Sequence, residues 1–199
     1  MKYDVILAGV GGQGVLSVAT IIAHAAISEG LEVRQSEVHG MAQRGGAVLA
    51  HMRIADGKIA GDLVPRGGAD LIISMEPLEG LRYVSYLKEG GILLTAAEPF
   101  DNMAKYPDVE GIYAAIKRLP KWQLIQTEAL AKEAGLAKTV NTVMVGAASC
   151  FLPLKADSLE KTIADVFSKK DAGTVQANSK AFKLGQQAGK PASGKAAKK

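Results

Sequence analysis

A glycine-rich turn near the start of the chain is the first group of residues that could serve chemistry. Residues 9–14 read GVGGQG and fit the pattern G-x-G-x-x-G between an apolar segment and a helical one. Backbone N–H groups at the start of a helix can approach a phosphate closely where glycine leaves no Cβ in the way. The turn therefore predicts dinucleotide or phosphate binding, or else only a tight strand-to-helix connection. Gln13 adds an amide donor and acceptor to it.

A second group of polar side chains and glycines follows in residues 36–54, which read SEVHGMAQRGGAVLAHMRI. Arg44 offers a planar set of donors that suits a carboxylate or a phosphate, and His39 and Gln43 can add neutral hydrogen bonds. Glu37 stands about 20 residues beyond the turn, where dinucleotide-binding folds place an acid on the ribose. The candidate site residues are Gly11, Gly12, Gln13, Gly14, Glu37, His39, Gln43, Arg44, Gly45 and Gly46.

Reactive side chains are not arranged for catalysis in this sequence. It has no serine or cysteine nucleophile with an adjacent base, no pair of carboxylates at a workable spacing and no cluster of metal ligands. Its one cysteine, Cys150, excludes an intramolecular disulfide and cannot supply the four thiolates that hold an iron–sulfur cluster. The sequence therefore predicts binding residues, and no catalytic or metal-ligating residue.

The order of apolar segments predicts an α/β protein. Expected strands cover residues 3–8, 32–36, 47–54, 70–75, 92–95 and 122–126, and expected helices cover residues 14–28, 77–88 and 108–118, with more helices beyond residue 128. The first strand, helix and second strand form a right-handed βαβ unit. Asp56-Gly57 predicts an antiparallel hairpin between the third strand and residues 58–59. The expected fold is an open, mostly parallel, Rossmann-like sheet with an antiparallel hairpin and extra C-terminal helices.

The glycine turn and the polar loop should face one crevice. Ligands of open α/β sheets bind outside the carboxyl ends of the strands, and residues 11–14 and 38–46 follow strands that we expect to be neighbours. Glu76 ends another strand and should lie near the same crevice. Asn141 opens a helix, and we expect its side chain to cap that helix.

The basic charge of the chain is concentrated at its C-terminal end. Residues 186–199 contain four lysines and no acid, which accounts for the whole net charge of +4. This segment has no apolar periodicity, so we expect a disordered, Lys-rich tail after a single α/β domain over residues 1–185. The neutral body gives no reason to expect a nucleic-acid partner. Because no apolar stretch could span a bilayer and no cleavable signal is recognisable, we expect a cytoplasmic protein without a membrane partner.

The two motifs together resemble a known enzyme family. GVGGQGV at residues 9–15 and SEVHGMAQRGGAVLAHMRI at residues 36–54 are similar to the small subunit of the indolepyruvate ferredoxin oxidoreductases, which is the gamma-type module of the 2-oxoacid:ferredoxin oxidoreductase family. The resemblance covers essentially the whole body, including NTVMVGAAS from Asn141. Pyruvate and 2-oxoglutarate members share the GGQG turn, whereas SEVHGMAQRGG is closest to the indolepyruvate branch.

The resemblance implies one subunit of a larger, thiamine diphosphate-dependent enzyme. In this family the thiamine diphosphate and the [4Fe-4S] clusters are held mainly by a large partner subunit. Ferredoxin accepts the electrons, and coenzyme A (CoA) takes up the arylacetyl group. The resemblance thus implies that this chain alone binds no cofactor and is inactive. Its candidate residues would form either part of the substrate and CoA cleft or an edge that faces the partner.

A stand-alone dinucleotide- or phosphate-binding Rossmann-like module is the alternative, either a NAD-dependent dehydrogenase or a regulator. It depends on the glycine turn and on Glu37. Two features of the sequence disfavour it. The expected hairpin interrupts the repeated βαβ pattern, and His39 and Arg44 would crowd a ribose.

Overall fold

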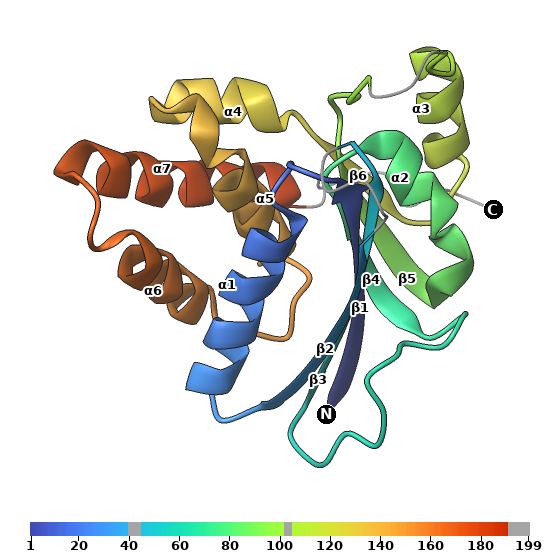
Figure 1. Ribbon diagram of the computed structural model, residues 1–199, viewed down its shortest axis with the longest axis horizontal. Coiled ribbons are helices and arrows are strands. Elements are labelled where there is room, and N and C mark those ends of the chain that lie inside the picture. The colour runs from blue at the N-terminus through green and yellow to red at the C-terminus, as the bar shows by residue number, and fades with distance from the viewer. Residues whose placement is uncertain (40–44, 102–104, 191–199) are drawn as a thin grey trace.

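The computed structural model describes residues 1–39, 45–101 and 105–190, and of His39 only the backbone. Its centre is a six-stranded sheet in the order β2-β3-β1-β4-β5-β6 (Figure 1). The strands are β1 (Lys2–Val10), β2 (Glu32–His39), β3 (Ala47–Ala55), β4 (Ala69–Ser74), β5 (Leu87–Ala96) and β6 (Trp122–Ile125). β1, β4, β5 and β6 pair in parallel, and β3 is antiparallel to both of its neighbours. The expected open, mostly parallel α/β sheet is confirmed.

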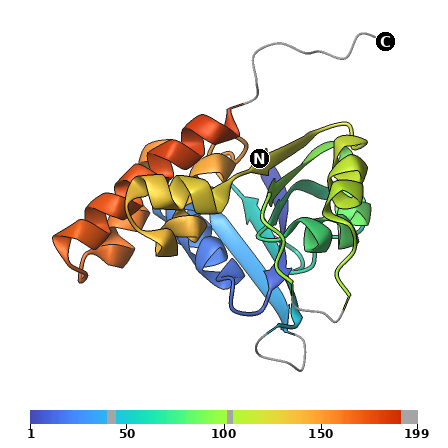
Figure 2. The same ribbon diagram turned by 90° about the horizontal axis from the view of Figure 1, so that it is seen from above.

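Helices cover both faces of the sheet. They are α1 (Val15–Ser28), α2 (Pro77–Arg82), α3 (Val109–Lys117), α4 (Thr127–Ala134), α5 (Val140–Ala148), α6 (Ala156–Phe167) and α7 (Ala172–Gly189), with 3₁₀ turns η1 (Val84–Tyr86) and η2 (Ala137–Thr139). Figures 1 and 2 show α1 and α4–α7 on one face, and α2 and α3 on the other. Across the described residues, no helix combines the length and apolarity that a bilayer crossing needs.

The direction in which strands are added explains the two helical layers. From β1 the chain passes through α1 to β2 on one side, whereas from β4 it passes through α2 to β5 and through α3 to β6 on the other side. Right-handed crossovers that run in opposite directions place their helices on opposite faces. The strand order therefore reverses between β1 and β4. The carboxyl ends of these two strands border the switch point, where sheets of this kind bind ligands.

The antiparallel strand β3 pairs differently from the sequence-based expectation. It lies between β1 and β2, which run in the same direction without being neighbours. The expected hairpin at Asp56-Gly57 is wrong, and residues 58–60 form no strand. The reason is that both edges of β3 already carry their hydrogen-bonded partners, so no edge is left for residues 58–59. The antiparallel partner that precedes β3 in the chain is β2.

The segment after β4 also departs from expectation. α2 ends at Arg82, a single 3₁₀ turn follows, and β5 begins at Leu87 rather than at residue 92. Gly90-Gly91 therefore lies inside β5. Gly90 has φ +76, and the pairing of β5 with β4 shifts register at this point. A glycine with positive φ and a local shift of register are typical of a β-bulge.

The C-terminal helices α5 and α7 form a closely packed pair. An ideal Cβ on Gly185 would lie 2.0 Å from the backbone oxygen of Val143, and one on Gly146 would lie 2.1 Å from that of Phe182. Only glycine allows the two backbones to approach this far, because any side chain would overlap the facing helix. α7 continues to Gly189, so residues 186–189 of the expected tail are helical. Residues 191–199 lie outside the described part of the chain.

Residues 56–68 fold back against β3, where the side chains of His51 and Arg53 hold them by hydrogen bonds to Val64, Gly61 and Leu63. The N–H of Val64 donates to Nδ1 of His51 at 3.2 Å, and the ring of Tyr86 packs edge-on against the imidazole with 5.5 Å between centroids. Burial lowers the pKa of His51, whose exposed fraction is 4%. The neutral imidazole is the form that holds this loop, because Nδ1 must keep a free lone pair to accept.

Gly185→Ala tests the close contact of α5 and α7. The new Cβ must displace the backbone of α5, so we expect the free energy of unfolding to fall by about 2–3 kcal/mol, although alanine is the better helix former. Denaturant unfolding of the full chain measures this change. Gln176→Ala, at an exposed position of the same helix, is the control and should stay within about 0.5 kcal/mol of the parent. Unchanged or higher stability of the Gly185 variant would contradict the packing.

The hydrogen bond to His51 predicts that stability depends on pH. The pKa of His51 is lowered in the folded chain, so the unfolded chain binds the proton more readily. The stabilising contribution is fully present above the ordinary histidine pKa of about 6.5 and is lost as pH falls below it.

His51→Asn separates the hydrogen bond from the titration. Asparagine keeps an acceptor for the N–H of Val64 but does not titrate, so its stability should fall less than that of the parent between about pH 7.5 and pH 5.5. The measurement is the midpoint of denaturant unfolding across this range. His24→Asn, at an exposed position of α1, should retain the pH dependence of the parent. A parent-like slope in the His51 variant would assign the effect to other groups.

Candidate functional site

The glycine turn joins the end of β1 to α1 at the carboxyl edge of the sheet. Gly12 and Gly14 have φ of +101 and +78, a backbone conformation that side chains with a Cβ rarely adopt. α1 begins at Val15 with no hydrogen bond from a capping side chain and no acidic residue in its first turn. Its positive end is therefore available to a negatively charged group. The strand–turn–helix context that the G-x-G-x-x-G pattern requires is confirmed.

Gln13 is a structural part of the turn. Its Oε1 accepts from the N–H of Val10 at 2.8 Å, and its Nε2 donates to the backbone oxygen of Met75 at 3.1 Å. The Gln13 amide, which we expected to face a ligand, thus forms hydrogen bonds within the protein through both its oxygen and its nitrogen. Because Val10 ends β1 and Met75 follows β4, Gln13 ties the two strands together across the switch point.

The backbone of Gly11 is joined to the loop that precedes β3. The N–H of Gly11 donates to the oxygen of Gly46 at 2.8 Å, and the N–H of Gly45 donates to the oxygen of Gly11 at 3.2 Å. This reciprocal pair continues the antiparallel ladder of β1 and β3 past the last strand residues. Gly45 and Gly46, the two glycines of the R-G-G step (residues 44–46), therefore lie beside the turn, and the expectation that both segments face one crevice stays a prediction.

The structure describes only some of the other candidate residues of the polar loop. Gln43 and Arg44 lie outside the described residues, as does the side chain of His39, so their expected role stays a prediction. Glu37 is an exposed residue of β2, directly opposite Ala50 of β3. The expectation that the turn and the polar loop follow neighbouring strands is wrong, because β3 separates β2 from β1. At about 5 Å per strand, Glu37 is one strand too far from β1 for the ribose contact of a dinucleotide site.

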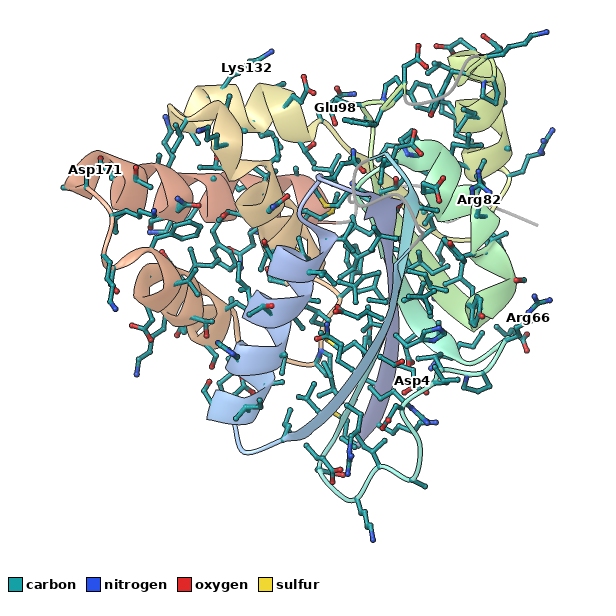
Figure 3. All side chains as sticks on the ribbon, viewed as in Figure 1. Asp4, Arg66, Arg82, Glu98, Lys132 and Asp171 are labelled. Carbon is teal, nitrogen blue, oxygen red and sulfur yellow. The ribbon has the colours of Figure 1, made fainter. Side chains whose placement is uncertain are left out.

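Two hollows flank the turn. One, of about 290 Å³, is lined by Val10, Gly11, Gly12, Gly14, Val15, Leu16 and Val48. The other, of about 200 Å³, is lined by Gly12, Gln13, Met75, Glu98, Pro99, Phe100, Thr127, Glu128 and Val140. The second hollow lies at the switch point. The carboxylate of Glu98 (Figure 3) caps the start of α4 there, accepting from the N–H of Glu128 and the hydroxyl of Thr127, both at 2.9 Å.

Two buried glutamates and the partly buried Tyr106 hold the wall of the second hollow. The Glu76 carboxylate accepts from the N–H of Glu79 at 2.7 Å, from the N–H of Phe100 at 3.4 Å and from the Tyr106 hydroxyl. Burial raises the pKa of Tyr106, and its hydrogen bond to the Glu76 carboxylate raises it further. Burial likewise raises the pKa of Glu79, which pairs with Arg82 at 2.9 Å. Glu76 lies near the crevice as expected, and its carboxylate is used to position Phe100.

Asn141 does not cap its helix, contrary to the expectation from sequence. The residue at the N-cap of α5 is Thr139, which makes no side-chain capping bond. The amide of Asn141 instead lies over Gly14, where an ideal Cβ would come within 2.1 Å of Nδ2. Two features therefore require glycine at position 14: its positive φ, and the Asn141 amide, which leaves no room for a Cβ.

Several residues of the two hollows were not predicted from the sequence. Met75 and Glu98 each follow a strand at the carboxyl edge, so the switch-point rule would have found them once the strand order was known. Phe100 and Val140 come from loops and helix ends, for which the sequence carries no such signal. In the described residues, no group of three or more His, Cys, Asp or Glu side chains is arranged to hold a metal ion.

The whole described body matches one protein family. The family model described as pyruvate ferredoxin/flavodoxin oxidoreductase matches residues 4–188. The chain belongs to this family. The resemblance expected from GVGGQGV and SEVHGMAQRGG is thereby confirmed.

Family members of known name and structure match over nearly the full length of the chain. The chain is 40% identical over 199 residues to indolepyruvate oxidoreductase subunit IorB of Pyrococcus horikoshii, covering 95% of this chain and 96% of that protein. It is similar to the gamma subunit of a keto/oxoacid ferredoxin oxidoreductase from Geobacter sulfurreducens, with a TM-score of 0.71, 26% identity and coverage of 95% and 97%.

A third protein of similar fold is a longer polypeptide. It is the 2-oxoglutarate:ferredoxin oxidoreductase from Magnetococcus marinus with 2-oxoglutarate, coenzyme A and succinyl-CoA bound, similar in fold with a TM-score of 0.76 at 22% identity. The likeness covers 95% of this chain and 31% of that chain. The fold described here thus spans about a third of that relative.

A double-mutant cycle tests the packing of Asn141 on Gly14. Gly14→Ala should lower the free energy of unfolding by about 2–3 kcal/mol, the sum of left-handed strain and the overlap with the amide. In an Asn141→Ala background the overlap is gone, so the same substitution should cost at least about 1 kcal/mol less. Denaturant unfolding of the four proteins gives the coupling energy. Equal costs in both backgrounds would contradict the contact.

Proposed function

We propose that this chain is the small, gamma-type subunit of a thiamine diphosphate-dependent 2-oxoacid:ferredoxin oxidoreductase that acts on aryl pyruvates such as indolepyruvate. In the proposed reaction the bond between the keto carbon and the carboxylate breaks, and carbon dioxide leaves. The acyl carbon forms a thioester with CoA. Two electrons pass to ferredoxin, and one proton is released.

The choice of aryl pyruvates over other 2-oxoacids is supported by the relatives. Identity to the indolepyruvate oxidoreductase subunit of Pyrococcus horikoshii is 40%. Identity to the 2-oxoglutarate synthase subunit KorC of Methanocaldococcus jannaschii is 28% over a similar share of the chain. The motif SEVHGMAQRGG, closest to the indolepyruvate branch, points in the same direction.

We infer the role of this subunit from one observation: the glycine turn is hydrogen-bonded to its neighbours at the carboxyl edge of the sheet, beside the switch point. The glycine turn is tied to β4 through Gln13 and to the R-G-G step through Gly11, with a hollow on each side. Backbone donors at a helix start suit phosphate groups, and CoA carries several. We therefore assign this edge to the cleft through which CoA or the 2-oxoacid reaches the reacting centre.

The cofactors of the proposed enzyme belong to a large partner subunit. Four thiolates hold a [4Fe-4S] cluster, and this chain has one cysteine. The sequence also contains no G-D-G…N pattern of the kind that binds thiamine diphosphate. Thiamine diphosphate supplies carbanion stabilisation in such enzymes, and the residues of this chain contribute binding and orientation.

Reconstitution tests the proposal as a whole. The full chain, mixed with a large subunit encoded beside it, should give CoA-dependent ferredoxin reduction with indolepyruvate, and each subunit alone should give none. A large subunit that is fully active alone would overturn the proposed role of this chain. Preferred turnover of 2-oxoglutarate would overturn the substrate class. Tight binding of NAD by the isolated chain in calorimetry would favour the dinucleotide-binding alternative.

The sequence R-G-G occurs at residues 44–46 and again at residues 66–68, so the two arginines provide a matched test of the CoA cleft. Arg44→Ala should raise the KM for CoA about tenfold, because it removes a charge-assisted hydrogen bond, and should leave the KM for the 2-oxoacid within about twofold. Arg66→Ala is the control, since Pro65 to Gly68 form an exposed turn with Gly67 at φ +72. Figure 3 shows Arg66 well apart from Glu98 at the switch point. Weaker subunit association with unchanged kinetics would assign Arg44 to the partner-facing edge instead.

A further inference from the structure

The two edge strands of the sheet are protected to different degrees. β6 has four residues, and the side chain of Gln123 joins it to α7 by donating to the backbone oxygen of Ala188 at 2.9 Å. β2 spans Glu32–His39, pairs with β3 without a shift of register and contains neither proline nor lysine. Edge strands of soluble proteins are usually short, bulged, covered or blocked by such residues. In the described part of the chain, β2 therefore presents the longer and less protected edge.

The hydrogen bonds of the sheet show which residues of β2 point to its outer edge. The N–H of Met75 donates to the oxygen of Ala8 at 2.9 Å, so even-numbered residues of β1 point to β4 and odd-numbered ones point to β3. The two registers carry this alternation through β3, so even-numbered residues of β2 point to β3. The backbone N–H and C=O groups of Val33 and Gln35 therefore point outward, where the described residues form no further strand.

The residue pattern of β2 favours a second copy of this chain as its partner. If a twofold axis passes beside Val33, that residue faces itself, and Glu32 of each copy faces Arg34 of the other. Opposite charges that face each other across antiparallel strands stabilise the pair, whereas like charges destabilise it. An axis beside Arg34 or Glu37 would place like charges opposite each other. At the two positions between them, no opposite charges face each other.

The charged side chains already lie together on one face of β2. Arg34 Nε is 3.1 Å from Glu32 Oε1, and Arg34 Nη1 is 4.0 Å from Asp62 Oδ1. The side chain of Arg34 is 48% exposed, so it can reach across the edge. With the axis beside Val33, two glutamates and two arginines alternate around it. Each charge then lies between opposite charges, and such a network contributes more than an isolated surface pair.

We propose that two copies of this chain pair through β2 about a twofold axis beside Val33, so that their sheets join into one. Val33 and Gln35 provide the backbone hydrogen bonds, and Glu32 and Arg34 set the register. Under the proposed function, this contact would join two gamma-type subunits within one enzyme. The pairing itself depends on β2 alone and on no catalytic activity.

Sedimentation equilibrium of the full chain tests the pairing. A single strand pair is a small interface, so the dissociation constant of the dimer should fall at roughly 10–500 μM. A chain that stays monomeric up to about 1 mM would overturn the proposal. The readout is the mass of the isolated chain, so its failure is independent of the outcome of reconstitution.

A charge swap tests the register. Glu32→Arg and Arg34→Glu each place like charges around the axis and should weaken dimerisation at least about tenfold. The double variant restores opposite charges and should return to within about threefold of the parent. Glu133→Arg, an equal change of charge at an exposed position of α4, is the control and should dimerise like the parent. Dimers that ignore both single changes would belong to another surface. If the chain is monomeric and the changes instead weaken binding of the large subunit, the edge belongs to that partner and the second copy is excluded.

Crosslinking locates the axis. In a Cys150→Ser background, Val33→Cys should form a disulfide between two copies, because paired Cα atoms in an antiparallel ladder lie about 5.5 Å apart. Gln35→Cys is the matched control. Its two copies should lie about 13 Å apart along the strands, too far for a disulfide. Equal crosslinking of the two variants, or stronger crosslinking of the Gln35 variant, would contradict the proposed axis.

Discussion

The insertion of β3 between β1 and β2 is the constraint on which the rest of the site depends. β3 runs antiparallel to both neighbours, so its first residues lie beside the last residues of β1. This register is what brings Gly45 and Gly46 to the backbone of Gly11. It also moves β2, and with it Glu37, one strand away from the glycine turn. The same insertion thus builds an edge of two joined loops and removes the acid position of a dinucleotide-binding fold.

Much of this fold follows from the sequence because its signals are local. The glycine turn, α1 and α3 (Val109–Lys117) lie within a residue or so of their expected positions, since caps and apolar periodicity act over a few residues. The hairpin at Asp56-Gly57 failed for a non-local reason. Asp-Gly is a sequence that favours a hairpin turn, but β3 has no free edge with which residues 58–59 could pair. The strand order decides this, and no short segment of the sequence determines the strand order.

The groups that the polar side chains contact could not be predicted from the sequence. Gln13 was expected to serve a ligand, yet it holds β1 to β4 through Val10 and Met75. Asn141 was expected to cap α5, yet it packs on Gly14, far away in the chain. For Gln13 the residue type correctly indicated a hydrogen-bonding role, whereas the Oδ1 of Asn141 has no hydrogen-bond partner among the described residues. Which group a side-chain amide meets depends on tertiary packing, because an amide has no preference between a ligand and a backbone oxygen.

The same contacts explain how a glycine-rich turn can present a defined surface. Glycines alone would leave the turn with many conformations, because they restrict φ and ψ least. Here Gln13 fixes the turn to β4, Gly11 is fixed to the loop before β3, and Asn141 covers Gly14. The turn is held from three sides while the N-terminal end of α1 carries no cap. A ligand that meets these backbone groups would therefore lose little free energy to ordering them, which is the advantage of a preorganised site. Under the proposed function, this rigidity is what the chain contributes to an enzyme whose cofactors belong to a partner subunit.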